Sequence, residues 1–158
     1  MFWKDKSGVS SIEILIVLVV MSIIASLSAV SYGNWQKDVQ AINARDELRA
    51  TLVRAQQLST AVAMDDQWGV HLEEDRIVLF KGSFYNQSEP ENIEHELQGV
   101  NILDPTNSFT DGAGGRQEDV LFYKFTGMTA NTGTVSIYPI SEPAAVKTLD
   151  VLATGHVE

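Results

Sequence analysis

The residue with the most distinctive chemical setting in this sequence is Glu13, which stands at the edge of a long apolar run. The run begins at Ile14 and continues, diluted by serine and alanine, to about Val30. A carboxylate that enters a membrane without a partner costs a few kcal/mol, so Glu13 must stay at the interface or meet a cation. Two charges that are each costly in hydrocarbon become tolerable as a pair.

The apolar run is about 17 residues long, which is the lower limit for a helix that crosses a bilayer. Lys4 and Lys6 precede it, so the positive-inside tendency keeps the N-terminus cytoplasmic and places everything after Val30 outside. Three interpretations are open: a secretory signal peptide cut after Ala29, a plain signal anchor, and a signal cut before the apolar run. Glu13 favours the last, because a secretory signal gains nothing from a carboxylate, whereas a filament subunit can pair it inside the assembly.

The segment Gly8-Val9-Ser10-Ser11-Ile12-Glu13, followed by the apolar residues 14–25, resembles the prepilin, or class III, signal. The shared features are a short basic leader, a glycine before the cut and a glutamate as the fifth residue after it. The usual first mature residue is phenylalanine, and Val9 departs from that pattern. The resemblance implies cleavage between Gly8 and Val9 by a membrane aspartic prepilin peptidase, followed by N-methylation of Val9. It also implies that Glu13 neutralises the N-terminal amine of a neighbouring subunit and so fixes the register of assembly.

Other residues offer little for catalysis. His71, His95 and His156 fall in different predicted strands or near the chain end, and no metalloprotease, serine-hydrolase or phosphate-binding motif is present. We therefore expect no enzyme activity and no cofactor, with His71 and His95 as surface residues of strands.

The loop 104–119 is rich in acidic residues and glycine, and oxygen ligands on such a loop could hold calcium. The candidates would be Asp104, Asp111 and Asp119, but their spacing is not that of an EF-hand. We expect no metal site, and a solvated acidic loop is the ordinary interpretation.

The chain has 11 Lys and Arg against 21 Asp and Glu, a formal net charge of −10, and no cysteine. The negative charge disfavours unassisted binding to nucleic acid or to anionic lipid. The lack of cysteine excludes a disulfide framework and a cysteine metal site.

Residues 31–64 predict an amphipathic helix that continues the apolar one. Its apolar side chains recur mainly at spacings of three and four; they are Trp35, Val39, Ile42, Leu48, Leu52, Ala55, Leu58 and Val62. We expect one helix from about Ile12 to about Met64, roughly 75 Å long at 1.5 Å per residue. Gly33 is the expected weak point, where this helix could bend or melt.

From residue 65 the apolar pattern changes to a period near two, which predicts strands. The candidate strands are 67–73, 76–81, 93–97, 100–103, 120–125, 133–140 and 147–153, with turn-rich stretches such as 104–118 between them. Glu74 and Asp75 form the expected hairpin turn, and Trp68 is expected in the core against the helix. The fold class is therefore α+β, with a long N-terminal helix packed on an antiparallel β-sheet head.

Several short motifs of the head are similar to the H-type pseudopilin and minor pilin family. They are Arg54-Ala55-Gln56-Gln57-Leu58-Ser59, Trp68-Gly69-Val70, Leu79-Phe80-Lys81-Gly82, Phe125-Thr126-Gly127, Gly133-Thr134-Val135-Ser136-Ile137 and Thr154-Gly155-His156-Val157. The resemblance implies two small antiparallel sheets against the helix, and a minor, tip-proximal or initiating role.

These observations divide the chain into a leader (1–8), a transmembrane or filament-core helix (9–30), an amphipathic stalk (31–64) and a β-rich head (65–158). The first hypothesis is a structural, minor subunit of a type IV pilus or type II secretion-like pseudopilus, anchored in the cytoplasmic membrane with its head outside. Its expected partners are prepilin peptidase, other pilin or pseudopilin subunits and membrane lipid before assembly, with no nucleic acid. The alternatives are a monomeric single-pass anchored binding module and a secreted enzyme with an ordinary signal peptide.

Overall fold

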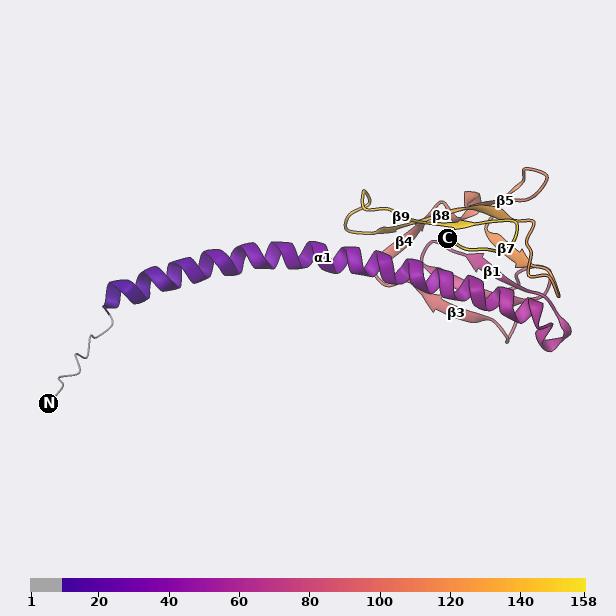
Figure 1. Cartoon of the computed structure of the whole chain (residues 1–158), viewed down its shortest axis with the longest axis horizontal. Helices are drawn as coiled ribbons and strands as arrows, with labels where there is room; N and C mark the ends of the chain where they lie inside the picture. Colours follow the sequence, from indigo (N-terminus) through magenta and orange to yellow (C-terminus); the bar gives the residue numbers. More distant parts are fainter. Residues whose placement is uncertain (1–9) are drawn as a thin grey trace. The chain divides into compact units, whose positions relative to one another are not determined.

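The computed structural model describes residues 10–158, with the side chains of 27–32 and 34 excepted. The chain forms two compact units, Met1–Gln36 and Lys37–Glu158. One helix, α1 (Ser11–Thr60), contributes residues to both units (Figure 1). The second unit is the head, which contains the end of α1 and all the strands.

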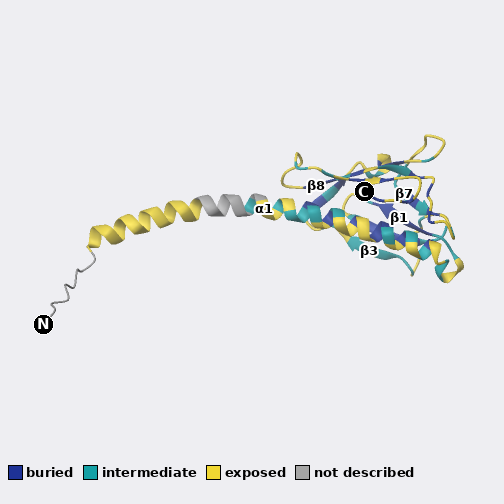
Figure 2. Ribbon diagram, viewed as in Figure 1, coloured by how far each residue is buried: buried dark blue, intermediate teal, exposed yellow. Residues whose placement is uncertain are grey.

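The described part of the first unit is helical from Ser11 onward. Gly33 does not interrupt the helix, so the predicted weak point remains helical in this structure. The described side chains from Ser11 to Ser26 are all exposed (Figure 2). Among the described residues, no helix combines the length and apolar character of a membrane span.

Helix α1 ends at Thr60, earlier than the predicted end at Met64. Val62, Met64 and Asp65 adopt left-handed backbone conformations, with φ of 52°, 58° and 55°. Only the short 3-10 helix η1 (Ala63–Asp65) follows. Two hydrogen bonds join this end of the helix to Trp68. The Trp68 backbone N–H donates to the hydroxyl of buried Ser59, and its indole N–H donates to the Ala63 carbonyl at 3.1 Å. These bonds turn the chain toward the first strand, which begins at Trp68, so the helix stops here.

The head contains two antiparallel sheets. In the four-stranded sheet the strand order is β3-β2-β1-β7. These strands are β1 (Trp68–Leu72), β2 (Arg76–Lys81), β3 (Ile93–Glu96) and β7 (Asp119–Phe122). The five-stranded sheet has the order β4-β8-β5-β6, and β9 pairs with β8. Its strands are β4 (Val100–Leu103), β5 (Phe109–Thr110), β6 (Arg116–Gln117), β8 (Thr132–Pro139) and β9 (Lys147–Val151).

The seven predicted strands are all present, and the α+β class with two sheets is confirmed. The strand predicted over 120–125 ends at Phe122, because Phe125 has a φ of 66° and bonds to the end of α1 through the Ser59 carbonyl. The stretch 104–118, predicted as turns, also holds the 3-10 helix η2 (Pro105–Asn107) and the short strands β5 and β6.

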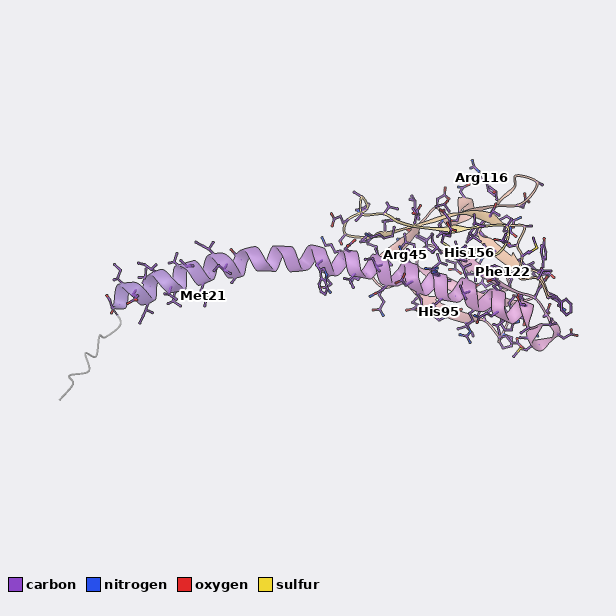
Figure 3. The ribbon with its side chains drawn as sticks, viewed as in Figure 1. Met21, Arg45, His95, Arg116, Phe122 and His156 are labelled. Atoms are coloured by element: carbon purple, nitrogen blue, oxygen red, sulfur yellow. The ribbon has the colours of Figure 1, made fainter. Side chains whose placement is uncertain are left out.

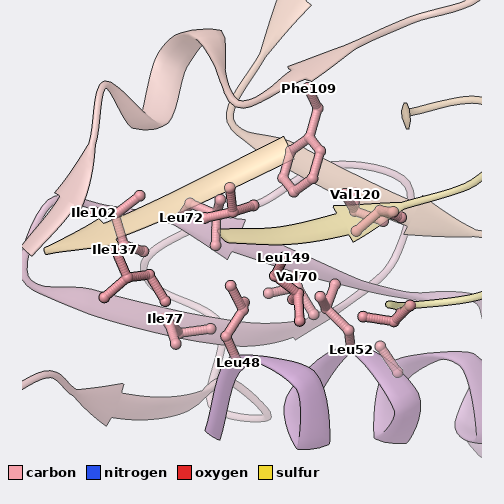
Figure 4. Close-up of a cluster of buried hydrophobic side chains, with 14 of the residues drawn as sticks. Leu48, Leu52, Val70, Leu72, Ile77, Ile102, Phe109, Val120, Ile137 and Leu149 are labelled. Atoms are coloured by element: carbon pink, nitrogen blue, oxygen red, sulfur yellow. The ribbon is translucent and has the colours of Figure 1, made fainter. Parts of the chain in front are cut away.

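The main core lies between α1 and the two sheets (Figure 4). Leu48 and Leu52 are fully buried and point toward Val70 and Leu149. Trp68 is 4% exposed and joins this core, as predicted. Burial of one leucine stabilises the fold by about 1.5–3 kcal/mol.

Over residues 35–44 of α1, the side chains that are buried differ from those predicted to be buried. Ala41 and Ala44 are buried, whereas Val39 and Ile42 are only half-buried and Trp35 is 61% exposed. On this part of α1 the small alanine side chains, rather than the larger residues, face the core.

Candidate assembly site at the start of helix α1

Glu13 lies in the first turn of α1. Its N–H donates to the Ser10 carbonyl at 3.0 Å, and the Ile14 N–H donates to the same oxygen at 3.3 Å. A carboxylate at this end of a helix interacts favourably with the helix dipole. The side chain is exposed, and no ion pair or hydrogen bond joins its carboxylate to another described residue. Glu13 is therefore open to a cation from elsewhere.

Gly8 and Val9, the predicted cleavage pair and methylation site, lie outside the described residues. Of the three residues predicted to carry the signal, Glu13 is the one whose position the structure gives.

The helix that follows Glu13 is apolar on every side. The large apolar side chains between Ile12 and Ile24 are all 49–67% exposed. A helix that is hydrophobic all round is normally buried in a large core or in a membrane. In this structure the segment lacks such a cover.

Two serines of the apolar segment, Ser22 and Ser26, satisfy their hydroxyl groups locally. Ser22 Oγ donates to the Leu18 carbonyl and Ser26 Oγ to the Ile23 carbonyl, both at 2.8 Å. Such bonds to the preceding turn remove the cost of placing a hydroxyl in an apolar environment. The Glu13 carboxylate differs from them because it is not satisfied within the described chain.

The three histidines do not form one site. The prediction that His71 is a surface residue is wrong: it is only 8% exposed, with Nδ1 at 2.6 Å from Asp119 Oδ1. His95 is half-buried on β3, and its Nδ1 lies 2.8 Å from Glu47 Oε1 on α1. His156 is exposed and lies in a different part of the head (Figure 3).

The calcium candidates are also separate, and each is engaged by its own neighbours. Asp104 accepts hydrogen bonds from Thr106 and Asn107. Asp111 accepts from the N–H groups of Ala113 and Gly115, and Asp119 is paired with His71. Over the residues that the structure describes, no group of three acidic or histidine side chains has the arrangement of a metal site.

An acidic groove in the head was not foreseen from the sequence. It has a volume of about 630 Å³ and lies between α1 and the β3–β4 segment. Its lining includes Glu47, Glu94, His95 and Glu96 over the apolar Leu97. These residues come from two distant stretches that each look like ordinary solvent-facing sequence, so no local pattern could have indicated it.

A long helix, bare at its start and packed at its end against two antiparallel sheets, defines a pseudopilin-type fold. Two solved structures of the minor pseudopilin EpsH, from the type 2 secretion system of Vibrio cholerae, have a similar fold over about three quarters of this chain. One has a TM-score of 0.52 at 14% identity, over 75% of this chain and 94% of that chain. The other has a TM-score of 0.52 at 16% identity, over 77% and 93%. The fold that the sequence resemblance implied is therefore confirmed. No protein-family model matches the sequence, and no curated protein matches it.

Proposed function

We propose that this chain is a structural subunit, present as a minor component, of a type II secretion pseudopilus or a closely related type IV pilus-type filament. Its start is cut between Gly8 and Val9 by a prepilin peptidase, and the new amine of Val9 is then N-methylated. Until assembly, the apolar helix holds the subunit in the cytoplasmic membrane with its head outside. The observation that carries the proposal is the bare apolar start of α1 on a chain whose head has the pseudopilin-type fold.

The size of the bare surface favours assembly or membrane insertion. Eleven large apolar side chains between Ile12 and Ile24 are exposed. Because each is 49–67% exposed, covering it contributes roughly half of the 1.5–3 kcal/mol of full burial, so the set is worth on the order of 10 kcal/mol. That is comparable with the typical stability of a whole domain, about 5–15 kcal/mol. A subunit with this helix will therefore partition into lipid or into a bundle of similar helices.

Glu13 supplies specificity within such a bundle. An unpaired ionised carboxylate costs about 2.5–3.5 kcal/mol at the centre of a membrane helix, and less at the first turn, where Glu13 lies. Pairing with the N-terminal amine of an adjacent subunit removes this cost and the matching cost of the amine. Only one axial offset between two subunits brings these groups together, so the pair sets the register.

The processing step is tested by co-expressing the full chain with a prepilin peptidase and determining the mature N-terminus by mass spectrometry. We expect N-methyl-valine at Val9, and an uncut chain for Gly8→Ala. An intact Met1 in the unaltered chain would instead indicate the anchored binding module, and a cut after Ala29 would indicate an ordinary secreted protein. Normal processing of Gly8→Ala would refute the signal assignment.

The assembly step is tested with Glu13→Gln, which keeps the shape of the side chain and removes its charge. Ser22→Ala is the matched control, because it alters another polar residue of the same exposed helix without changing its charge. We expect both variants to insert into membrane, and Glu13→Gln alone to lose incorporation into sheared filaments by at least about tenfold, equivalent to 1.4 kcal/mol. Equal incorporation of the two variants would contradict the pairing role.

A further inference from the structure

Strand β3 leaves one edge of the four-stranded sheet open. It pairs with β2 along one side, and no described strand pairs with its other side. The Leu97 N–H donates to the Asp75 carbonyl at 2.8 Å, so the antiparallel ladder directs the backbone groups of His95, two residues earlier, toward β2 as well. The N–H and C=O groups of Glu94 and Glu96 therefore point away from β2, and no other described residue bonds to them.

The acidic groove of the head runs beside this open edge. Helix α1 contributes one wall through Gln40, Asn43 and Glu47, which lie three and four residues apart and so share one face of the helix. Residues 94–98 contribute the other wall. His95 connects the two walls, with its Nδ1 2.8 Å from Glu47 Oε1 (Figure 3). An extended segment that lies along the β3 edge would therefore have α1 on its inner side.

The charge of the groove is negative. Its lining includes the carboxylates of Glu47, Glu94 and Glu96, and there is no lysine or arginine among its described lining residues. Glu94 also lies 3.4 Å from the Arg76 guanidinium, whereas no ion pair joins Glu96 to another described residue. A partner that complements this groove is therefore basic.

Alternation along β3 sets the spacing of the basic residues in such a partner. Ile93 and Leu97 pack against the main core, so Glu94 and Glu96 point to the outer face of the sheet, which is turned away from that core. On an added strand, the two residues opposite Glu94 and Glu96 point to the same outer face and are separated by one residue. Lysine or arginine at alternate positions thus meets both carboxylates.

We propose that the open edge of β3 and the groove beside it form a docking site for an extended, basic segment of another protein. The segment adds a strand to the sheet, bonds through its backbone to Glu94 and Glu96, and pairs its alternate lysine or arginine side chains with their carboxylates. Its intervening side chains lie along α1, over Leu97. The site belongs to the head and is separate from the start of α1, so it does not depend on the proposed processing or filament assembly.

The probe is a capped peptide of about seven residues in which lysine and threonine alternate, with an uncharged fluorescent label. Fluorescence anisotropy measures its binding to the full chain in a nonionic detergent. We expect a Kd below about 1 mM at low salt, and binding at least about fivefold weaker at about 0.5 M salt. A peptide with glutamate in place of lysine should not bind. Absence of binding by the lysine peptide, or equal binding of the two peptides, would overturn the proposal.

The charge of the edge is tested with the double variant Glu94→Gln and Glu96→Gln, which keeps the backbone of β3. Glu89→Gln with Glu142→Gln is the matched control, because both glutamates are exposed and lie outside the groove lining. We expect the first pair of substitutions to weaken binding of the lysine peptide on the order of fivefold to tenfold, and the control pair by less than about twofold. Equal affinities of the two double variants would overturn the proposal.

Strand addition is tested through the backbone of the peptide, without altering the protein. One lysine peptide carries N-methyl groups on its lysine backbone nitrogens, and another carries them on its threonine nitrogens. Because N–H groups of a strand point alternately to its two edges, only one of these peptides keeps a free edge for β3. We expect the two affinities to differ by at least about tenfold. Equal affinities would overturn strand addition.

Amide hydrogen exchange of the full chain identifies the strand that is contacted. We expect the peptide to slow exchange at Glu94 and Glu96 by at least about tenfold, and to leave exchange at His95, which already faces β2, unchanged. Unchanged exchange at Glu94 and Glu96 would overturn the site. If these amides were protected without peptide and lost protection on dilution, a second copy of the chain would be the occupant, and the proposal would fail. Mass spectrometry of the processed N-terminus, which tests the proposed filament function, is independent of these results.

Discussion

Replacing Ser59 by alanine removes one oxygen atom that joins the end of α1 to the start of β1. The Ser59 hydroxyl is 0% exposed, accepts the Trp68 N–H at 2.7 Å and donates to the Trp68 carbonyl at 3.2 Å. Loss of the hydroxyl leaves a buried backbone N–H without this partner, and such a group costs about 1–3 kcal/mol. For a head of this size, we expect a fall in Tm of about 4–12 °C.

The assay is urea unfolding of the full chain, followed by tryptophan fluorescence and far-ultraviolet circular dichroism. Thr60→Ala is the matched control, because the neighbouring hydroxyl is exposed and bonds only within its own helix, to the Gln56 carbonyl at 2.8 Å. We expect Thr60→Ala to change the free energy of unfolding by less than about 0.5 kcal/mol. If Ser59→Ala and Thr60→Ala had the same urea midpoint, Ser59 would not be the connection between helix and sheet that its geometry indicates.

Two further variants test the core and the outer face. Leu52→Ala removes a fully buried side chain, so we expect a loss of about 2–5 kcal/mol in urea unfolding, against a small loss for the half-buried Val53→Ala. Because folding raises the pKa of Tyr85, its contribution to stability is complete below about pH 10 and is lost as pH rises further. Tyr85→Phe should therefore show a shallower loss of stability between pH 9 and 11 than the parent in urea unfolding, and an equal loss would contradict the raised pKa.

The sequence predicted the architecture of the head because long elements carry strong periodicity. The three- and four-residue spacing located the buried Leu48 and Leu52, and alternation located strands such as β2 and β8. Strands β5 and β6 were missed because each is two residues long, too short for alternation to register.

For the functional candidates, the sequence indicated Glu13 but did not indicate the burial of His71. Glu13 was singled out because a carboxylate beside an apolar run is conspicuous in the sequence itself. His71 was taken as a surface residue because alternation correctly turned it away from the core residues of β1. Its burial depends on Tyr85, fourteen residues further along, which folds back over it. Such coverage is a tertiary contact that no local spacing encodes.

The exposed carboxylates of β3 affect how two heads can pair when copies of the chain lie close together. β3 is an edge strand, and an exposed edge presents unpaired backbone groups to any strand of a neighbouring chain. Glu94 and Glu96 stand at alternate exposed positions along it. A second head that tried to extend the sheet would bring its own copies of these charges alongside, so repulsion keeps identical heads from joining edge to edge. Wherever many copies gather, the carboxylates of β3 would therefore oppose edge-to-edge aggregation of the heads.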